Sequence, residues 1–186
     1  MQLHDTGIPG VLLIEPRRVH DENGDITELL DLGPESNQEN IFPEFVQDNT
    51  SLSIRRNTLR GLHYQRPPHA QGKLVRCAQG ALLDVAVDIR VGSPFFGKWQ
   101  AVELSASNRR RLYIPPGFLH GFLTLVDDTV IEYKCSDFYA AECDGAVRWD
   151  SLGIDWGTTD PLLSDKDAAA VAFADFESPF EFGKIS

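Results

Sequence analysis

Residues Ala81–Arg90 read ALLDVAVDIR, a run in which apolar and charged side chains alternate. A period of two residues is typical of a β-strand with two different faces. The apolar face holds Leu83, Val85, Val87 and Ile89, and the other face holds Asp84, Asp88 and Arg90. Gln79-Gly80, just before this run, is typical of a hairpin turn, so Lys73–Ala78 is predicted to be the preceding strand.

Further short strands are predicted along the chain, separated by turn residues. They are Trp99–Leu104, Arg111–Ile114, Gly121–Leu125 and Val130–Cys135. The turns fall at Gly92-Ser93-Pro94, Ser107-Asn108, Pro115-Pro116-Gly117 and Asp127-Asp128. Short strands at even spacing with Gly and Pro between them predict an all-β fold, a double-sheet jelly roll with a few short helices.

The C-terminal region has a different pattern. A short helix is predicted after Asp165, because Ser164-Asp165 supplies a cap and Ala168–Ala172 is rich in helix formers. The chain then ends in an aromatic, acidic tail containing Phe173, Phe176, Phe180 and Phe182. We expect this tail to pack either on the sheet or on a partner subunit.

The length, charge and cysteine content limit the kinds of protein that this chain can be. The chain has 186 residues, enough for one domain with a full core, and its net charge is −11. That acidity argues against a nucleic-acid partner, which requires a broad basic surface. No apolar run approaches the length of a membrane span, and no secretory signal is visible. Three cysteines without close spacing indicate reduced thiols in a cytoplasmic protein.

One segment departs from this acidic balance. Residues Asn57–Arg76 read NTLRGLHYQRPPHAQGKLVR and contain no acidic side chain. A solvated basic face and a site for a small, strongly anionic ligand both fit this composition. The glycines at 61 and 72, the Pro67-Pro68 turn and the two histidines favour a shaped pocket.

The histidines admit several roles. His63, His69 and His120 in a β-barrel are compatible with a metal site, since such sites need several converging imidazoles or carboxylates. The usual close pair of histidines with a nearby Glu is absent, and Arg60 and Lys73 would repel a cation. A histidine that only satisfies core hydrogen bonds is the simpler reading, and an inward histidine beside cations is suited to act as a base.

Four ordered motifs carry a resemblance to a known family. They read RGLHYQxPPxAQGKLVRC, DVAVDIRxGSPxFGxW, LYIPPGFxHGF and YKCSDFY, and FVQDNTSLS and LLSDKD add to them. The chain resembles the dTDP-4-dehydrorhamnose 3,5-epimerase family from Gly10 to about residue 170. The resemblance implies a single epimerase domain over residues 1–186, a cupin-like jelly roll, a homodimer and activity without metal or organic cofactor. It also implies a role in dTDP-L-rhamnose biosynthesis for surface polysaccharide.

The resemblance implies specific roles for residues that composition alone leaves open. The expected reaction inverts C3 and C5 of dTDP-4-dehydro-6-deoxy-glucose by proton abstraction next to the C4 ketone. His63 is the implied base with Asp167 as its orienting partner, Tyr133 the acid and Lys73 the oxyanion stabiliser. From the residues alone, Tyr133 is more simply a packing residue and Asp167 a capping acid. Implied substrate contacts are Glu28, Gln47, Asp48, Asn49, Arg60, His120, Tyr139, Asp144 and Lys166. Arg60 is expected at the diphosphate and Tyr139 against thymine.

Two departures from the family pattern bear on the substrate. Asn23 stands where an arginine that reaches the diphosphate is common, and Asp144 replaces a commoner Glu. Three alternatives stay open beside the 3,5-epimerase. They are an epimerase that inverts only C3 or only C5, a metal-dependent cupin such as a dioxygenase or isomerase, and a catalytically silent sugar-nucleotide binding module.

Overall fold

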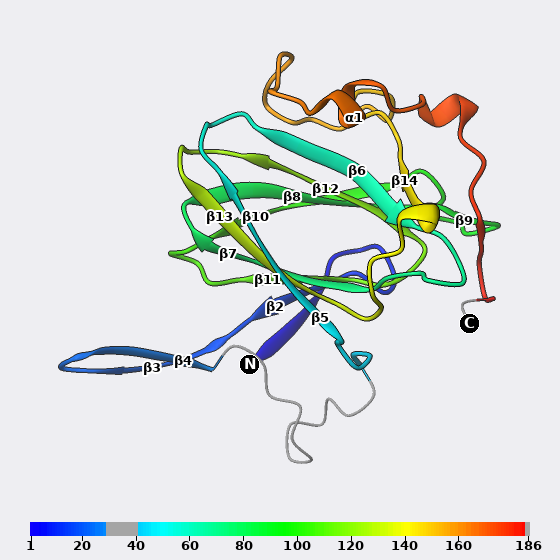
Figure 1. Cartoon of the computed structure of the whole chain (residues 1–186). Coiled ribbons are helices and arrows are strands. Elements are labelled where there is room, and N and C mark those ends of the chain that lie inside the picture. The colour runs from blue at the N-terminus through cyan, green and yellow to red at the C-terminus, as the bar shows by residue number, and fades with distance from the viewer. Residues whose placement is uncertain (29–40, 185–186) are drawn as a thin grey trace.

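The computed structural model describes residues 1–28 and 41–184, without the side chains of Asp21, Asp25, Ile26 and Glu28. Two antiparallel sheets face each other in it (Figure 1). The six-stranded sheet runs β1 (Gln2–Asp5), β2 (Leu12–Glu15), β11 (Arg111–Ile114), β7 (Lys73–Gln79), β13 (Thr129–Cys135) and β5 (Gln47–Ser53). The five-stranded sheet runs β10 (Trp99–Ser105), β8 (Ala81–Asp88), β12 (Phe118–Thr124), β6 (Leu59–Gln65) and β14 (Asp144–Ala146). This arrangement confirms the predicted all-β double-sheet jelly roll.

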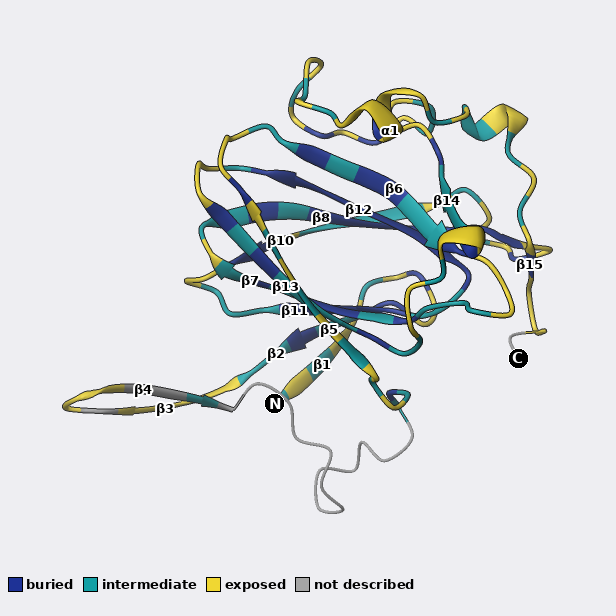
Figure 2. Cartoon of the chain, in the orientation of Figure 1, coloured by how far each residue is buried: buried dark blue, intermediate teal, exposed yellow. Residues whose placement is uncertain are grey.

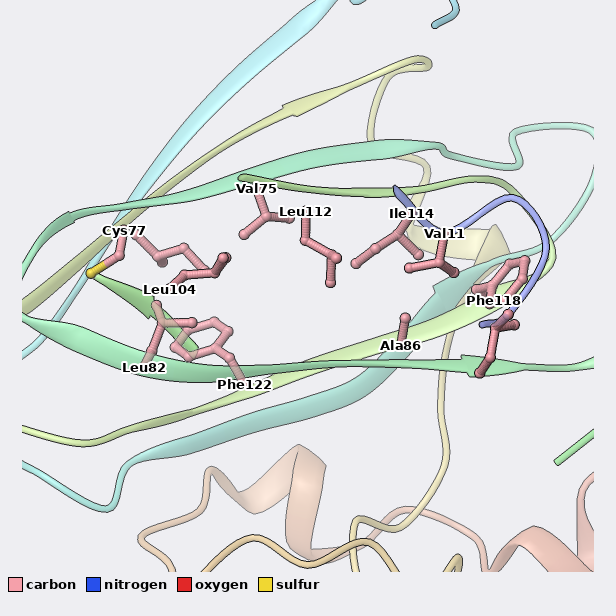
Figure 3. Close-up of a cluster of buried hydrophobic side chains, with 12 residues drawn as sticks. Val11, Val75, Cys77, Leu82, Ala86, Leu104, Leu112, Ile114, Phe118 and Phe122 are labelled. Carbon is pink, nitrogen blue, oxygen red and sulfur yellow. The ribbon is translucent and has the colours of Figure 1, made fainter. Parts of the chain in front are cut away.

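The main core lies between the two sheets. Figure 3 shows Val75 and Leu112 of one sheet facing Leu82, Ala86 and Phe122 of the other. β7 and β8 belong to opposite sheets and contribute side chains to this core from its two sides, so they are not paired side by side. The predicted hairpin between them is therefore wrong, and the turn at Gly80 carries the chain from one sheet to the other.

A second core covers the outer side of the five-stranded sheet. Val85, Val87 and Ile89 pack there against Trp156 and Phe180 of the C-terminal segment. The predicted apolar face of Ala81–Arg90 is thus confirmed, but its charged face is also buried. Asp84 and Asp88 are both fully buried, so β8 has no solvated face.

The C-terminal segment, which covers the five-stranded sheet, contains a single helical turn. Helix α1 (Asp165–Ala168) starts at Ser164, whose Oγ accepts from the backbone N–H of Asp167, as predicted. The predicted continuation through Ala172 is wrong. Val171 instead forms an extended bridge to Val147, which draws the chain out of the helix.

The aromatic tail packs on the sheet. Phe173, Phe176 and Phe180 join the second core, which confirms the first of the two expectations for it. The tail contains η3 (Phe173–Asp175) and ends in β15 (Phe180–Glu181), which pairs in parallel with β9 (Arg90–Val91).

The other sheet is less completely covered. A third buried cluster lies on its outer face and consists of Ile14, Phe42, Leu74 and Tyr113. Strand β5 forms an edge of this sheet and has exposed side chains (Figure 2). A hairpin of β3 (Arg17–Asp21) and β4 (Gly24–Glu28) projects away from the sheets (Figure 1), with Asn23 in its turn. No helix of the described residues is long and apolar enough to span a membrane.

Candidate active site

A cavity of about 450 Å³ is lined by residues of both sheets and of the segments that follow β13 and β14. It holds eight of the residues singled out from the sequence, namely Gln47, Asn49, His63, Lys73, Tyr133, Tyr139, Asp144 and Lys166. The folded chain thus brings together residues separated by more than a hundred positions.

His63 carries a buried carboxylate partner. Its Nε2 lies 2.5 Å from Oδ1 of Asp167, and Ser164 donates to the other carboxylate oxygen at 2.8 Å. Burial raises the pKa of Asp167, but hydrogen bonds from His63, Ser164 and the backbone N–H of Gly61 outweigh it and hold the pKa below its usual range. An ionised Asp167 accepts the Nε2 proton, so the lone pair of neutral His63 resides on Nδ1.

Glycine permits the close approach of strands that places His63. His63 lies opposite His120 in the register of β6 and β12, beside a bulge. A Cβ on Gly61 would lie 2.6 Å from the Cα of Gly121, and Gly61 has a φ of +128°. Only glycine satisfies both requirements, which accounts for the RGLH and HGF motifs around the two histidines.

Lys73 and Tyr133 approach the cavity from the opposite sheet, on β7 and β13. Burial lowers the pKa of the Lys73 ammonium, and the charges of nearby acidic groups, Asp144 and Asp84 among them, oppose that effect. Burial raises the pKa of the Tyr133 hydroxyl, with the charge of Arg60 acting against it. The tyrosine therefore retains its proton at neutral pH and is able to donate it.

A second His–Asp pair lies beside His63, on the neighbouring strands β12 and β8. His120 Nε2 is 2.7 Å from Oδ1 of Asp84, and both side chains are buried. Oδ2 of Asp84 has no hydrogen-bond partner within the described part of the chain, and its charge acts on Lys73. His120 thus stands next to the site through Asp84 but is not among the cavity-lining residues.

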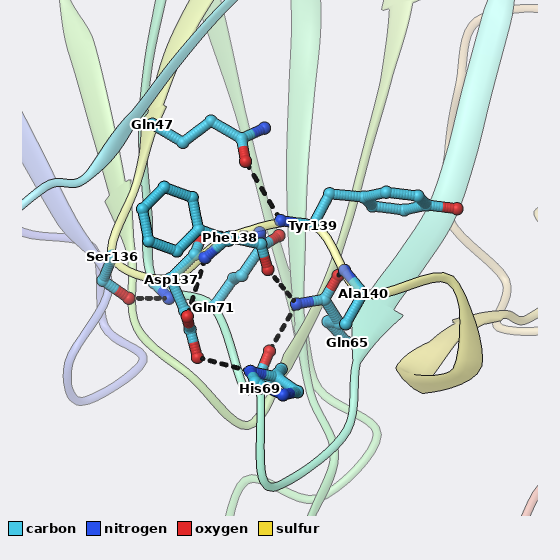
Figure 4. Close-up of polar contacts among 10 residues, drawn as sticks. Gln47, Gln65, His69, Gln71, Ser136, Asp137, Phe138, Tyr139 and Ala140 are labelled. Carbon is cyan, nitrogen blue, oxygen red and sulfur yellow. Dashed lines mark hydrogen bonds and ion pairs between the residues drawn. The ribbon is translucent and has the colours of Figure 1, made fainter.

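Tyr139 and its neighbours form a further part of the cavity lining. Tyr139 is 61% exposed, and its hydroxyl donates to Asp144 at 3.2 Å. Lys166 also contacts the Asp144 carboxylate. Gln47 accepts from the backbone N–H of Tyr139 at 3.0 Å, as Figure 4 shows. The result is an exposed aromatic face beside a cation and several amides.

Some expected site residues lie elsewhere. Arg60 lines a neighbouring hollow and its Nε approaches Ser53 Oγ at 3.4 Å. The Asp48 side chain is on the outer face of its sheet, where it pairs with Lys134. The side chain of Glu28 is outside the described part of the structure. His69 pairs with Asp137 at 3.2 Å and is not among the residues lining the cavity.

Sequence reasoning missed several lining or supporting residues. Tyr64, Gln65, Gln71 and Cys135 line the cavity, while Ser164 and Asp84 hold Asp167 and His120. Tyr64, Gln65 and Gln71 lie within the basic segment Asn57–Arg76. The prediction of a pocket in that segment could have identified these three residues as candidates. No group of three His, Cys, Asp or Glu side chains arranged to hold a metal occurs within residues 1–28 and 41–184.

The facing sheets and the cavity they enclose at one end define a cupin-like jelly-roll protein. The chain belongs to the dTDP-4-dehydrorhamnose 3,5-epimerase family, whose model matches residues 5–175. It is 47% identical over 177 residues to the dTDP-4-dehydrorhamnose 3,5-epimerase of Shigella flexneri, covering 94% of this chain and 97% of that protein.

Two solved structures extend the comparison. The dTDP-6-deoxy-D-glucose-3,5-epimerase of Legionella pneumophila, in complex with dTDP-4-keto-L-rhamnose, has a TM-score of 0.88 and 40% identity, with 96% of this chain and 97% of that one covered. ChmJ, a 3′-monoepimerase from Streptomyces bikiniensis in complex with dTDP-quinovose, has a TM-score of 0.83 and 37% identity, with coverages of 92% and 87%. Both one-centre and two-centre epimerases thus share this fold.

Proposed function

We propose that the chain inverts C3 and C5 of dTDP-4-dehydro-6-deoxy-glucose to give dTDP-4-dehydro-L-rhamnose, a step of dTDP-L-rhamnose biosynthesis. The main support for this proposal is the arrangement of residues around the cavity. His63, backed by Asp167, enters it from the five-stranded sheet, and Lys73 and Tyr133 enter it from the other. A base and an acid on opposite walls are what inversion at carbon requires.

The proposed chemistry follows from the position of the ketone. C3 and C5 both adjoin C4, so loss of either proton gives an enolate with its charge on O4. His63 Nδ1 takes the proton, and Asp167 stabilises the imidazolium that forms. Lys73 stabilises the charge on O4. The Tyr133 hydroxyl then donates its proton to the carbon from the other ring face, and exchange with solvent restores both groups.

The nucleotide half of the substrate is assigned to the part of the cavity lined by Tyr139 and its neighbours. Tyr139 stacks on thymine, and Gln47, Asn49, Asp144 and Lys166 supply polar contacts around it. We also propose substrate contacts by Arg60, His120 and Asp48, which are not among the residues lining the cavity, and by Glu28, whose side chain is outside the described part of the structure. An arginine at position 60 suits a diphosphate because its guanidinium binds phosphate oxygens in pairs.

Product analysis tests the proposal. Purified protein is incubated with dTDP-4-dehydro-6-deoxy-glucose, and the product is reduced and identified by NMR. We expect the L-rhamno configuration, inverted at both carbons. Inversion at C3 alone would instead favour a monoepimerase, the activity named for ChmJ. An unchanged substrate would contradict both activities.

We further propose a single-domain, cytoplasmic homodimer. The three cysteines are free and buried, as suits a reducing compartment. For the dimer, the support is the outer face of the six-stranded sheet. There Arg111 is only 6% exposed, and its Nε has no hydrogen-bond partner within the described residues. The charge of Glu132 acts on Arg111, but a buried N–H without an acceptor is costly, and a carboxylate from a second copy would satisfy it.

A further inference from the structure

We propose that Gln65 is a positioning residue for the nucleotide base. It fixes the backbone on both sides of Tyr139 and so presents the Tyr139 ring as a preformed stacking surface. This inference rests on the proposed function, in which Tyr139 contacts the base. Gln65 needs no contact with the base itself to play this part.

Gln65 ends β6 and is buried, with 5% of its surface exposed. Its side-chain amide bonds only to backbone groups of two loops (Figure 4). Nε2 donates to the carbonyl oxygens of His69 and Phe138, the latter at 2.9 Å, and Oε1 accepts from the N–H of Ala140 at 3.0 Å. Both donors and the acceptor of the amide are therefore used.

Two of these bonds flank Tyr139 directly, at residues 138 and 140. Residues 136–140 form neither helix nor strand, so no regular ladder fixes this segment. Gln47 holds the N–H of Tyr139 itself at 3.0 Å. With residues 138, 139 and 140 each held by a side-chain amide, the backbone that carries the Tyr139 side chain is fixed in place.

Within the described residues, the position of the ring depends mainly on that backbone and on one hydrogen bond of its hydroxyl. Tyr139 is 61% exposed, and its hydroxyl donates a hydrogen bond to Asp144. A mobile ring would have to be ordered when the base binds, and that cost would reduce affinity. Gln65 reduces this ordering cost before the base binds, because it stands on β6, a strand hydrogen-bonded between β12 and β14.

The choice of glutamine is specific to this task. A leucine of similar size would leave two carbonyl oxygens and one N–H without their present partner in a buried place. A glutamate would keep an acceptor for Ala140 but turn a negative oxygen toward two carbonyl oxygens. When protonated, that glutamate would regain one donor, so its effect should depend on pH.

The test compares binding of dTDP and of pyrophosphate by calorimetry in the wild type and in Gln65→Leu. We expect dTDP to bind about tenfold more weakly to the variant, equivalent to about 1.4 kcal/mol. Pyrophosphate affinity and the turnover number at saturating substrate should stay within about twofold. Gln79→Leu is the control away from the cavity, since Nε2 of the exposed Gln79 also holds a loop carbonyl, that of Asp128. It should leave dTDP affinity unchanged.

Two further variants separate positioning from a general structural role. In a Tyr139→Ala background, Gln65→Leu should weaken dTDP binding by less than about twofold, because its effect passes through the ring. In Gln65→Glu, dTDP affinity relative to the wild type should recover as the pH falls from about 8 to about 5. Should Gln65→Leu fail to fold, this pH-dependent recovery still tests the proposal.

The outcomes distinguish this inference from the proposed function. Wild-type protein that binds dTDP, with a Gln65→Leu variant of equal affinity, would overturn the positioning role alone. An equal loss of pyrophosphate binding, or a full additional loss in the Tyr139→Ala background, would also overturn it. Wild-type protein that fails to bind dTDP would overturn the proposed function and this inference together.

Discussion

At the scale of single residues, Tyr133 and His63 reach the cavity from different sheets. We therefore expect His63 to take the proton from the substrate carbon and Tyr133 to return a proton to it. His63 has a carboxylate behind it, whereas Tyr133 is kept protonated by burial, which raises its pKa. Removing the phenolic hydroxyl should therefore spare proton abstraction and impair proton return.

Tyr133→Phe tests this division of labour. We expect product formation to fall by about 10²–10⁴-fold, the range typical of a general acid, while dTDP affinity changes little. The measurement is turnover by a coupled reductase assay, with dTDP binding by calorimetry as the control for folding. Product formation at the wild-type rate would exclude Tyr133 as the acid.

Single residues also show what the sequence alone can predict. The proposed roles of His63, Lys73 and Tyr133 come from motif resemblance, and the fold brings these residues to one cavity. The second His–Asp pair could not be predicted in this way. Asp84 and His120 are thirty-six positions apart, and nothing in the local pattern pairs them. Only the pairing of β8 with β12 brings the two side chains together.

At the scale of elements, the end of β8 is tied to the C-terminal tail. Asp88 bonds to Arg90 at 2.6 Å and to Ser93 at 2.7 Å, and both members of the Asp88–Arg90 pair are buried. The Arg90 guanidinium also lies 4.5 Å and 5.1 Å from the ring centres of Phe118 and Phe182. This cluster joins β8, β12 and the tail after β15.

Asp88→Asn should destabilise the fold in a pH-dependent way. Burial raises the pKa of Asp88, but its bonds to Arg90 and Ser93 outweigh this and lower the pKa. Its stabilising contribution is thus present above about pH 4, the unfolded value, and is lost as the pH falls through the lower folded value. We expect a cost of about 3–5 kcal/mol at pH 7 that shrinks in acid.

Urea unfolding at several pH values measures this cost. Asp150→Asn is the matched control, because Asp150 pairs with Arg148 at 2.6 Å on the surface, and it should cost less than about 1 kcal/mol. Equal losses for the two variants, or a loss for Asp88→Asn that does not change with pH, would contradict the assignment.

The elements also mark where prediction from sequence fails. The alternation in Ala81–Arg90 correctly predicted the strand and its apolar face, because a local period sets both. It did not reveal that Asp84 and Asp88 are buried, since their partners come from other segments or from beyond the strand. Likewise, helix-forming Ala168–Ala172 ends early because Val171 pairs with distant Val147.

At the scale of the whole molecule, the proposed dimer predicts a role for Arg111. The wild type should sediment at about twice the chain mass of 20.7 kDa. Arg111→Leu should weaken self-association by at least tenfold, because it removes the charge that a carboxylate of the second copy would pair with. Sedimentation equilibrium over a dilution series measures this directly.

Arg148→Leu provides the control for the Arg111 experiment. Arg148 is half-exposed in the C-terminal segment and pairs with Asp150, so self-association should not change. A wild type that remains a monomer at high concentration, or an unaltered dimer in Arg111→Leu, would contradict the proposed interface.

The most direct test of the central proposal follows solvent deuterium into the substrate. Protein and dTDP-4-dehydro-6-deoxy-glucose are combined in D₂O, and C3 and C5 are observed by NMR for the wild type and for His63→Asn. We expect deuterium at both carbons with the wild type and at neither with the variant, while dTDP still binds to both proteins. Undiminished exchange in His63→Asn, or no exchange with the wild type, would contradict proton abstraction by His63.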